Sequence, residues 1–403
     1  MARSALTALG TFGLVIIAAA ALSCSGAGNS NGGTAAAAGV GGGGGGSGGG
    51  LNIGGNGNGG SGGGGSPGWT CTPGKPEPGA IDIPGNGKDD DCDGTADNGP
   101  PANCDSAITK VEDNDPMNAA RAIGLCQVSD GVKWGVIEAK YVKADGAPES
   151  TAPPVNPLQH GLLAKFGPNV NAQEGTRMLG LSSGTARQPS DSGYQSPGGF
   201  DAKSMGTVPP GFPIDSPSCP GVQTANDKKA WNPVALELKI KAPLNAKSFK
   251  FNFDFYTFEF PVYVCSQYND FFVALQSPAP PSALQGNISF DSQKNPVSVN
   301  NGFLEVCQPQ TAKGKTFPCA LGTAQLDGTG FGADPTDPLG QLHAATGWLE
   351  TVSPVSGGSE FTLRFAIWDM GDPVLDSTVL IDNFTWSTEG GDIPVTNPVP
   401  VPK

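Results

Sequence analysis

The sequence predicts an all-β protein, an antiparallel sandwich of jelly-roll type with one short helix. Residues 234–240 and 249–255 carry a large apolar side chain at every second position, as strands with one buried face do. Further strand-like segments lie at 270–275, 361–368 and 378–386. Long connections rich in Pro and Gly, such as residues 188–224, separate the segments, and this pattern favours antiparallel strands over a parallel α/β sheet.

Two local features refine this plan. The predicted helix begins near Met117, because Asp115 can cap it and Pro116 suits its first turn. After residue 255 the alternation shifts phase at Tyr256 and resumes at Phe258, which predicts a β-bulge.

Glycine is concentrated near the N-terminus. Of the 61 glycines, 23 fall within residues 25–66, and a chain of that composition and length is a flexible coil with a span of roughly 35 Å. We therefore predict five segments. They are a lipoprotein signal peptide at 1–23, a lipid-attachment site and disordered linker at 24–66, a small metal-binding module at 67–103, a β-sandwich domain at 104–389 and a Pro-rich disordered tail at 390–403.

The N-terminal segment predicts export. Arg3 precedes an apolar stretch that ends at Ser23-Cys24, as in a signal peptide. The small residue before Cys24 resembles the lipobox of bacterial lipoproteins, in which that Cys is lipidated and becomes the mature N-terminus. The resemblance implies an outer-membrane or cell-surface lipoprotein; the alternatives are an uncleaved membrane helix and soluble secretion.

The remaining cysteines predict disulfides. Eight are left after Cys24, an even number in an exported chain. Eight cysteines allow 105 pairings, and proximity along the chain suggests Cys71–Cys92, Cys104–Cys126, Cys219–Cys265 and Cys307–Cys319. The closely spaced Cys pairs typical of zinc sites are absent from the sequence.

An acidic loop at residues 89–97 predicts a calcium site. Asp89, Asp91, Asp93 and Asp97 stand at positions one, three, five and nine, and Gly94 stands at position six. This spacing lets alternate side chains converge on one cation while the carbonyl of Thr95 adds a further oxygen. Pro100 replaces the bidentate Glu of an EF-hand, so Asp82, Asp90 or water would complete the coordination. The alternative is a solvated acidic turn.

The same loop resembles a metal-binding motif of many bacterial surface and secreted proteins. Residues 86–97 read Asn-Gly-Lys-Asp-Asp-Asp-Cys-Asp-Gly-Thr-Ala-Asp, close to the motif Cys-Asn-Gly-x-Asp-Asp-Asp-Cys-Asp-Gly-x-x-Asp. Gly85 stands where the family has a Cys, and Cys71 could substitute for it. Copper is sometimes associated with that family, but all-oxygen ligands favour calcium.

A longer segment resembles the bacterial choice-of-anchor L domains. The resemblance lies in residues 118–126, 251–270 and 362–384, among them Glu-Phe-Pro-Val-Tyr-Val-Cys-Ser-Gln-Tyr-Asn-Asp and Leu-Arg-Phe-Ala-Ile-Trp-Asp. It implies a surface-displayed β domain without established catalytic chemistry. The chain ends in a Pro-Val repeat and not in an apolar sorting helix, so the N-terminal lipid would be the anchor.

Signs of catalysis are weak. The two histidines, His160 and His343, adjoin no nucleophile motif and are interpreted as loop residues. Acid pairs for glycoside hydrolysis could come from Glu259, Asp270, Asp369, Asp372, Asp376 and Asp382. Any acidic β domain contains comparable candidates, so these residues are weak evidence for a hydrolase.

Two further features suggest binding. A second cation site could form from Asp369, Asp372, Asp376 and Asp382. The alternative is that the first three lie in a solvated turn and Asp382 in the strand that follows it. Trp368 shares a strand face with Thr362 and Arg364, so it could stack on a ligand or be covered by another part of the chain.

Taken with a net charge of -14, which disfavours nucleic acid as a partner, these features predict a function. We expect a non-catalytic, lipid-anchored surface protein that binds calcium and serves structural or adhesive display, with an extracellular glycan or protein as partner. The alternatives are a surface carbohydrate-binding protein and an extracellular hydrolase.

Overall fold

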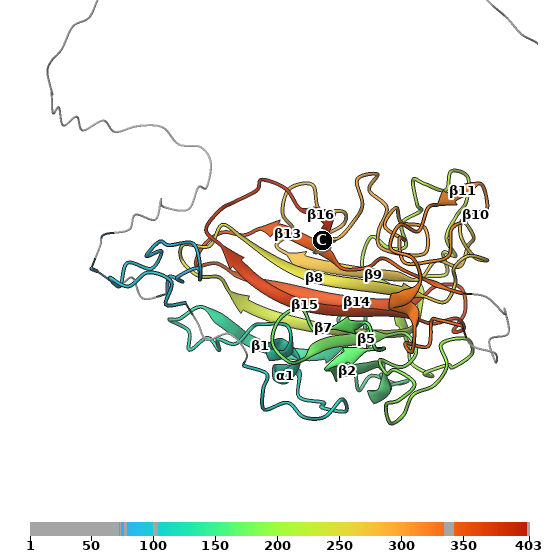
Figure 1. Cartoon of the computed structure of the whole chain (residues 1–403), viewed down its shortest axis with the longest axis horizontal. Coiled ribbons are helices and arrows are strands. Elements are labelled where there is room, and N and C mark those ends of the chain that lie inside the picture. The colour runs from blue at the N-terminus through green and yellow to red at the C-terminus, as the bar shows by residue number, and fades with distance from the viewer. Residues whose placement is uncertain (1–71, 73, 76–78, 100–103, 334–341, 401–403) are drawn as a thin grey trace, which may run out of the picture. The chain divides into compact units, whose positions relative to one another are not determined.

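Two antiparallel sheets form most of the structure, a computed structural model that describes residues 72, 74–75, 79–99, 104–333 and 342–400 (Figure 1). The first sheet has the order β1-β7-β14-β9, with β6 beside β7. Its strands are β1 (Gly135–Val142), β6 (Met205–Thr207), β7 (Lys229–Lys241), β9 (Phe271–Ser277) and β14 (Glu360–Asp369).

The second sheet has the order β16-β13-β8-β15-β5-β2, with β12 beside β8. Its strands are β2 (His160–Leu163), β5 (Met178–Ser182), β8 (Ser248–Thr257), β12 (Ala344–Ala345), β13 (Leu349–Pro354), β15 (Ser377–Ser387) and β16 (Val395–Pro398). The short pairs β3 (Lys165–Phe166) with β4 (Val170–Asn171) and β10 (Gln310–Ala312) with β11 (Lys315–Phe317) lie in connections, as do the 3-10 turns η1 (Pro157–Gln159) and η2 (Ala324–Leu326).

The long strands alternate between the sheets along the chain. β7, β9 and β14 belong to the first sheet, and β8, β13 and β15 belong to the second. This alternation is typical of jelly rolls, and the prediction of an all-β antiparallel sandwich is confirmed.

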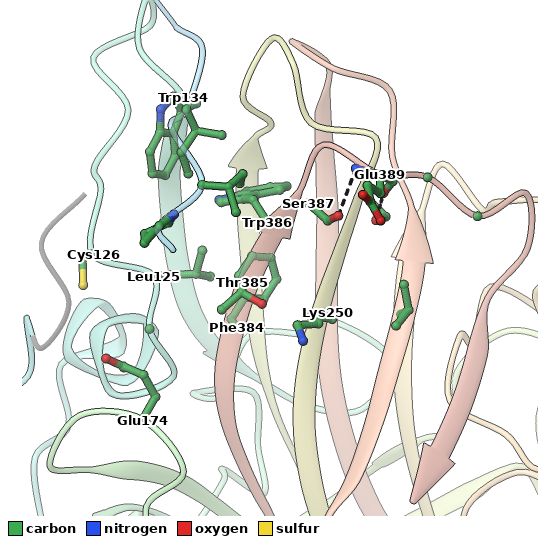
Figure 2. A pocket seen from close by; sticks show the side chains of 18 residues that line it. Leu125, Cys126, Trp134, Glu174, Lys250, Phe384, Thr385, Trp386, Ser387 and Glu389 are labelled. Atoms are coloured by element: carbon green, nitrogen blue, oxygen red, sulfur yellow. Dashed lines mark hydrogen bonds between the residues drawn. The ribbon is translucent and has the colours of Figure 1, made fainter. Parts of the chain in front are cut away.

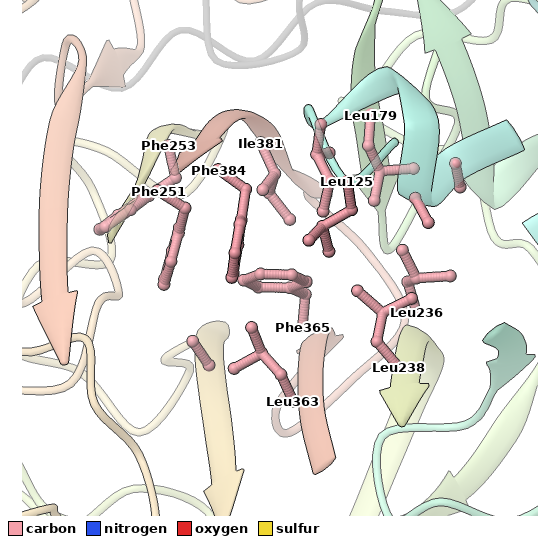
Figure 3. Packing of buried hydrophobic residues seen from close by; sticks show 14 of the residues in the cluster. Leu125, Leu179, Leu236, Leu238, Phe251, Phe253, Leu363, Phe365, Ile381 and Phe384 are labelled. Carbon is pink, nitrogen blue, oxygen red and sulfur yellow. The ribbon is translucent and has the colours of Figure 1, made fainter. Parts of the chain in front are cut away.

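The main core lies between the sheets (Figure 3). Every second residue of the long strands points into it, because side chains alternate between the two faces of a strand. The core includes Leu236 and Leu238 of β7, Phe251 and Phe253 of β8, Leu363 and Phe365 of β14, and Ile381 of β15. The alternation seen in the sequence therefore identifies the inner faces correctly.

The bulge expected at Tyr256 is wrong. β8 pairs with β15 in regular register there, with Tyr256 opposite Thr378. Tyr256 and Phe258 belong to a second cluster that also contains Phe166 and Phe331. The change in the apolar pattern arises because both faces of this strand end are covered, and not because the strand kinks.

The predicted helix is confirmed as α1 (Pro116–Ala122). The Asp115 side chain accepts a hydrogen bond from the Met117 N–H at 2.9 Å, so it caps the first turn. Ala119, Ala120 and Ala122 are buried against the core.

The prediction of a disordered tail at 390–403 is wrong for its described part. β16 pairs with β13 from Leu349 opposite Pro398 to Val352 opposite Val395. The Thr351 and Thr396 hydroxyls lie 2.9 Å apart. A proline-containing segment is tolerated here because β16 is an edge strand.

Three disulfides join pairs of described cysteines: Cys104–Cys126, Cys219–Cys265 and Cys307–Cys319. They are the pairs that sequence proximity suggests. The signal peptide, Cys24, the glycine linker and Cys71 lie outside the described residues, so the Cys71–Cys92 pair and lipidation stay predictions. In the described part of the chain, no helix is long and apolar enough to cross a membrane.

Candidate cation-binding sites

The predicted calcium loop brings three of its carboxylates together. Ligand oxygens of Asp89, Asp91 and Asp93 all lie within 4.8 Å of one another. Among the described residues, no other group of three or more acidic, His or Cys side chains has this spacing. Asp93 is exposed, whereas Asp89 and Asp91 are half-buried.

Backbone amides hold these side chains in place. The Asp93 N–H donates to Asp89 Oδ1 at 3.1 Å and to Asp91 Oδ1 at 3.2 Å. The Gly94 N–H donates to Asp89 Oδ2 at 2.9 Å. Gly94 has φ of +98°, a conformation that glycine adopts without strain, so the sixth position requires Gly for the turn that the sequence predicts.

The other two predicted ligands have different roles. Asp97 Oδ1 accepts the N–H groups of Asn86 and Gly87, at 2.9 and 3.1 Å, and so closes the loop. The Thr95 N–H donates to Asp93 Oδ1 at 2.8 Å. The side chains that converge are therefore Asp89, Asp91 and Asp93, without Asp97.

Asp82, which the sequence suggests as an additional calcium ligand, instead holds the loop backbone through hydrogen bonds. It is buried, and its two oxygens accept the N–H groups of Asp90, at 2.9 Å, and Asn98, at 2.6 Å. Its position between the apolar residues Ile81 and Ile83 is the only signal of burial that the sequence offers.

Asn245 attaches the loop to the sandwich. Its Oδ1 accepts the Ile81 N–H at 2.9 Å, and its Nδ2 donates to the carbonyls of Ile81 and Asp90 at 2.7 and 2.8 Å. Ile81 itself packs in the main core. Residues 79–99 are thus an extension of the sandwich and share its core.

The electrostatics of the loop favour a cation. Partial burial raises the pKa of Asp91, and the negative charges of Asp93, Asp82 and Asp89 raise it further, against a lowering hydrogen bond from the Asp93 N–H. A bound divalent cation would offset this repulsion.

The four residues of the second predicted cation site are not brought together as one group. Asp382 lies apart, because its Oδ2 accepts the N–H groups of Gln173 and Glu174 at 2.6 and 3.2 Å. Asp372 is half-buried and accepts the Val374 N–H. Asp369 and Asp376 instead join two residues from elsewhere in the chain. We call Glu259, Asp270, Asp369 and Asp376 the buried carboxylate cluster, since all four are at most 2% exposed.

Burial dominates the chemistry of this cluster. It raises the pKa of each of the four carboxyl groups, and the charge of Asp270 raises those of Glu259, Asp369 and Asp376 further. A polysaccharide cannot reach enclosed carboxyl groups, so the cluster is not an open acid pair for glycoside hydrolysis.

Of the two alternatives for Trp368, ligand stacking is wrong and the covered position is confirmed. Its ring is fully buried in a cluster on the outer face of the first sheet, packed against Phe212 and Phe271. The connection that carries Phe212 crosses this face. Trp368 is therefore not available for stacking on a ligand.

Both histidines are enclosed as well. His160 begins β2 and stacks on Tyr141, with ring centroids 3.8 Å apart. Burial, together with the Arg187 charge, lowers the pKa of His160 to about 4. His343 is fully buried and stacks on Phe258.

An apolar groove of about 690 Å³ lies beside the Asp89 loop (Figure 2). Trp134, Trp386 and Phe384 form its aromatic wall, and Glu174, Lys250 and Glu389 also line it. The rings of Trp134 and Trp386 meet edge to face at 6.3 Å. Its volume is in the range of small-molecule sites. No sequence motif points to the groove, because its lining comes from segments far apart in the chain.

Residues 220–386 match the choice-of-anchor L domain. The match covers β7 to β15. Of the remaining strands of the two sheets, β1, β2, β5 and β6 precede it and β16 follows it. A choice-of-anchor domain indicates an exported, bacterial cell-surface protein, and the family is not a known enzyme family. No curated protein and no solved structure matches the chain.

Proposed function

We propose that this protein is a non-catalytic display protein of the bacterial cell surface that binds Ca²⁺ through its Asp89 loop. The observation that carries the proposal is the convergence of the Asp89, Asp91 and Asp93 oxygens within 4.8 Å. Carboxylate oxygens are the ligands that Ca²⁺ prefers. Water and the Thr95 carbonyl would complete the coordination.

The choice-of-anchor L match supports surface display. The enclosure of His160, His343 and the buried carboxylate cluster supports a role without catalysis, because these are the groups that acid–base chemistry would use. Calcium would stiffen the region that connects the sandwich to the preceding chain.

Attachment through a lipidated Cys24 belongs to the same proposal. The Ser23-Cys24 junction and the glycine-rich residues 25–66 would together make a lipid anchor followed by a long spacer. An adhesive or structural domain needs such reach to contact a partner beyond the membrane surface.

Calcium titration of the EDTA-treated full protein tests the first part. We expect Asp91→Asn to weaken binding at the loop by about tenfold or more, since a directly coordinating carboxylate is lost. Asp113→Asn, at another acidic position, is the matched control. Unchanged binding in the Asp91 variant would overturn the loop assignment.

Mass spectrometry of the mature N-terminus tests the anchor. We expect a diacyl or triacyl group on Cys24 and release of a Cys24→Ala variant from the membrane fraction. A mature protein that begins elsewhere, without lipid, would contradict this part and leave the calcium assignment intact.

A second candidate function is carbohydrate binding in the groove of Figure 2. Trp134 offers a partly exposed aromatic face in a groove that the charged Lys250 also lines, and aromatic faces stack on sugar rings. A glycan array would decide. We expect any saccharide bound there to be lost in both Trp134→Ala and Lys250→Ala and retained in Trp231→Ala, a tryptophan outside the groove. Absence of binding across the array would remove this candidate.

A further inference from the structure

The buried carboxylate cluster lies where four strands meet. Glu259 follows β8, Asp270 precedes β9, Asp369 ends β14 and Asp376 precedes β15. β8 pairs with β15 at Thr257 and Ser377, and β14 pairs with β9 at Trp368 and Phe271. Strand pairing therefore gathers four carboxylates, remote in sequence, at one end of the sandwich.

Part of the cluster has ordinary hydrogen-bond partners. Asp270 Oδ1 accepts the Met370 N–H at 3.2 Å, and its Oδ2 accepts the Ser377 hydroxyl at 2.9 Å. Glu259 Oε2 accepts the Asp270 N–H at 3.2 Å. These contacts fix the positions of the two carboxyl groups and leave lone pairs on their oxygens.

Other oxygens in the cluster have no donor. Both carboxylate oxygens of Asp376 and Oδ1 of Asp369 are buried without a hydrogen-bond partner. The same holds for Oδ1 of Asn232, whose Nδ2 donates to Asp369 Oδ2 at 3.2 Å. All three side chains are completely buried. Buried polar groups are normally paired, so this concentration of unpaired oxygens marks a place for a ligand that accepts electron pairs.

No positive charge among the described residues balances Asp369 or Asp376, although side-chain hydrogen bonds from Ser183 and Asn232 partly stabilise Asp369. The charges that act on Asp369 are those of Asp270 and Asp376, and those acting on Asp376 are Asp270 and Asp201. Lys203 contacts Asp201 at the surface, where the lysine side chain is largely exposed. Buried charges are stable only when paired or when they coordinate a metal.

We propose that Asp270, Asp369 and Asp376 bind a second Ca²⁺ inside the sandwich, with Asn232 as an additional oxygen ligand. The donors are all oxygens, which selects a hard cation. Ca²⁺ accepts irregular sets of six to eight oxygens at roughly 2.3–2.6 Å, whereas Mg²⁺ requires a stricter octahedron. The ligand oxygens of Asp270, Asp369 and Asp376 do not all lie within 4.8 Å of one another in this structure. The Asp376 side chain, whose oxygens no hydrogen bond restrains, would therefore turn toward the other two to complete the coordination.

Gly184 shows how closely the chain is built around Asp376. A Cβ at position 184 would lie 2.1 Å from Asp376 Oδ2, so only glycine fits beside this carboxylate. The backbone thus encloses the Asp376 oxygens without offering them a donor.

This inference is independent of the Asp89 loop, and the experiment must separate the two. We use the full-length protein with Asp89, Asp91 and Asp93 all changed to Asn, here called the loop variant. After EDTA treatment and dialysis against Ca²⁺, the bound calcium is measured by elemental analysis. We expect the loop variant to retain one Ca²⁺ per chain, and the addition of Asp376→Asn to remove it. Asp382→Asn, a buried carboxylate outside the cluster, is the matched control and should leave the ion bound.

Thermal unfolding gives a second readout if the Asp376 variant folds poorly with calcium. In EDTA, Asp376→Asn should unfold at the same temperature as the loop variant or higher, because one uncompensated carboxylate is gone. With Ca²⁺, the loop variant should be the more stable of the two. A loop variant that retains no calcium and whose unfolding temperature is insensitive to EDTA would overturn the internal site, while leaving the Asp89 loop assignment intact. If instead the wild-type protein binds one ion that the loop variant retains, the internal site stands and the loop assignment fails.

Discussion

The Asp89 loop and the buried carboxylate cluster contain the same side chains in opposite surroundings. In the loop, the oxygens of Asp89 and Asp93 accept backbone N–H groups, and Asp93 is exposed to solvent. In the cluster, Asp376 is enclosed and both of its oxygens lack a donor. The loop can therefore exist with or without a cation, whereas the carboxylates of the cluster, when ionised, depend on one for charge compensation.

This contrast implies different consequences of binding. A cation in an exposed loop orders that loop and has little effect on the stability of the rest of the protein. A cation that links the ends of β9, β14 and β15 holds both sheets together, so its binding free energy adds to global stability.

The largest expected effect of this difference is on amide hydrogen exchange. With free Ca²⁺ at a hundredfold excess over the dissociation constant, a site present only in the folded state adds about 2.7 kcal/mol of stability. We expect amides of β14 and β15 that exchange by global unfolding to slow by about a hundredfold in Ca²⁺ relative to EDTA. Amides of residues 86–98 exchange by local opening of the loop, so Ca²⁺ should slow them only by suppressing that opening.

The loop variant is the control for that measurement. It should lose the calcium effect at residues 86–98 and keep the effect in the sheets. Equal loss in both regions would contradict the distinction between a local and a global site.

His160 tests whether burial destabilises a positively charged side chain as it destabilises the negatively charged carboxylates of the cluster. Its pKa is lowered to about 4 in the folded protein, against about 6.5 when unfolded. Below pH 6.5 the unfolded state binds the proton and the folded state does not, so stability falls as the pH drops toward 4. The difference corresponds to about 3 kcal/mol.

Denaturant unfolding of wild type and His160→Gln at pH 7 and pH 4.5 measures this effect. Acidic groups titrate in both proteins, so the His160 contribution is the difference between their pH dependences. We expect the wild type to lose more stability than the variant over this range. Identical pH profiles would show that the imidazole is accommodated in its charged form.

Asn245 tests how far the loop depends on the sandwich. Its three hydrogen bonds to Ile81 and Asp90 are lost in Asn245→Ala, which leaves buried backbone groups unpaired at a cost of about 2 kcal/mol. We expect faster proteolysis within residues 79–99 and weaker calcium binding at the loop, with an unchanged internal site. Asn171→Ala, at an exposed position, is the control; equal protease resistance in both variants would argue against the attachment role.

The sequence predicts the inner faces of the strands well, because alternation in 234–240 and 249–255 depends only on which face is buried. It cannot predict what covers an outer face. Trp368 is enclosed because Phe212, far away in the chain, packs over it. The proline-rich segment around Val395 likewise pairs with β13 because the fold leaves that sheet edge open, which the local sequence does not indicate.

The two carboxylate sites show the same limit. The spacing of Asp89, Asp91 and Asp93 is local, so the sequence suffices to identify them. Grouping Asp369 and Asp376 with Asp382 by proximity fails, because their actual neighbour Asp270 is brought in by the pairing of β9 with β14. Asn232 carries no motif at all.

Asp97 provides the smallest and sharpest test of the loop. The spacing of the motif predicts a ligand, whereas the structure uses Asp97 Oδ1 to accept the Asn86 and Gly87 N–H groups. An amide oxygen can accept the same bonds, so Asp97→Asn should reduce calcium affinity by about threefold at most, or about 0.7 kcal/mol. Asp93→Asn should reduce it by about tenfold or more, because its carboxylate is one of the three that converge. Titration calorimetry on both variants in an Asp376→Asn background isolates the loop. Equal losses would mean that Asp97 turns inward to the cation, and that the motif spacing describes the bound loop better than the arrangement seen here.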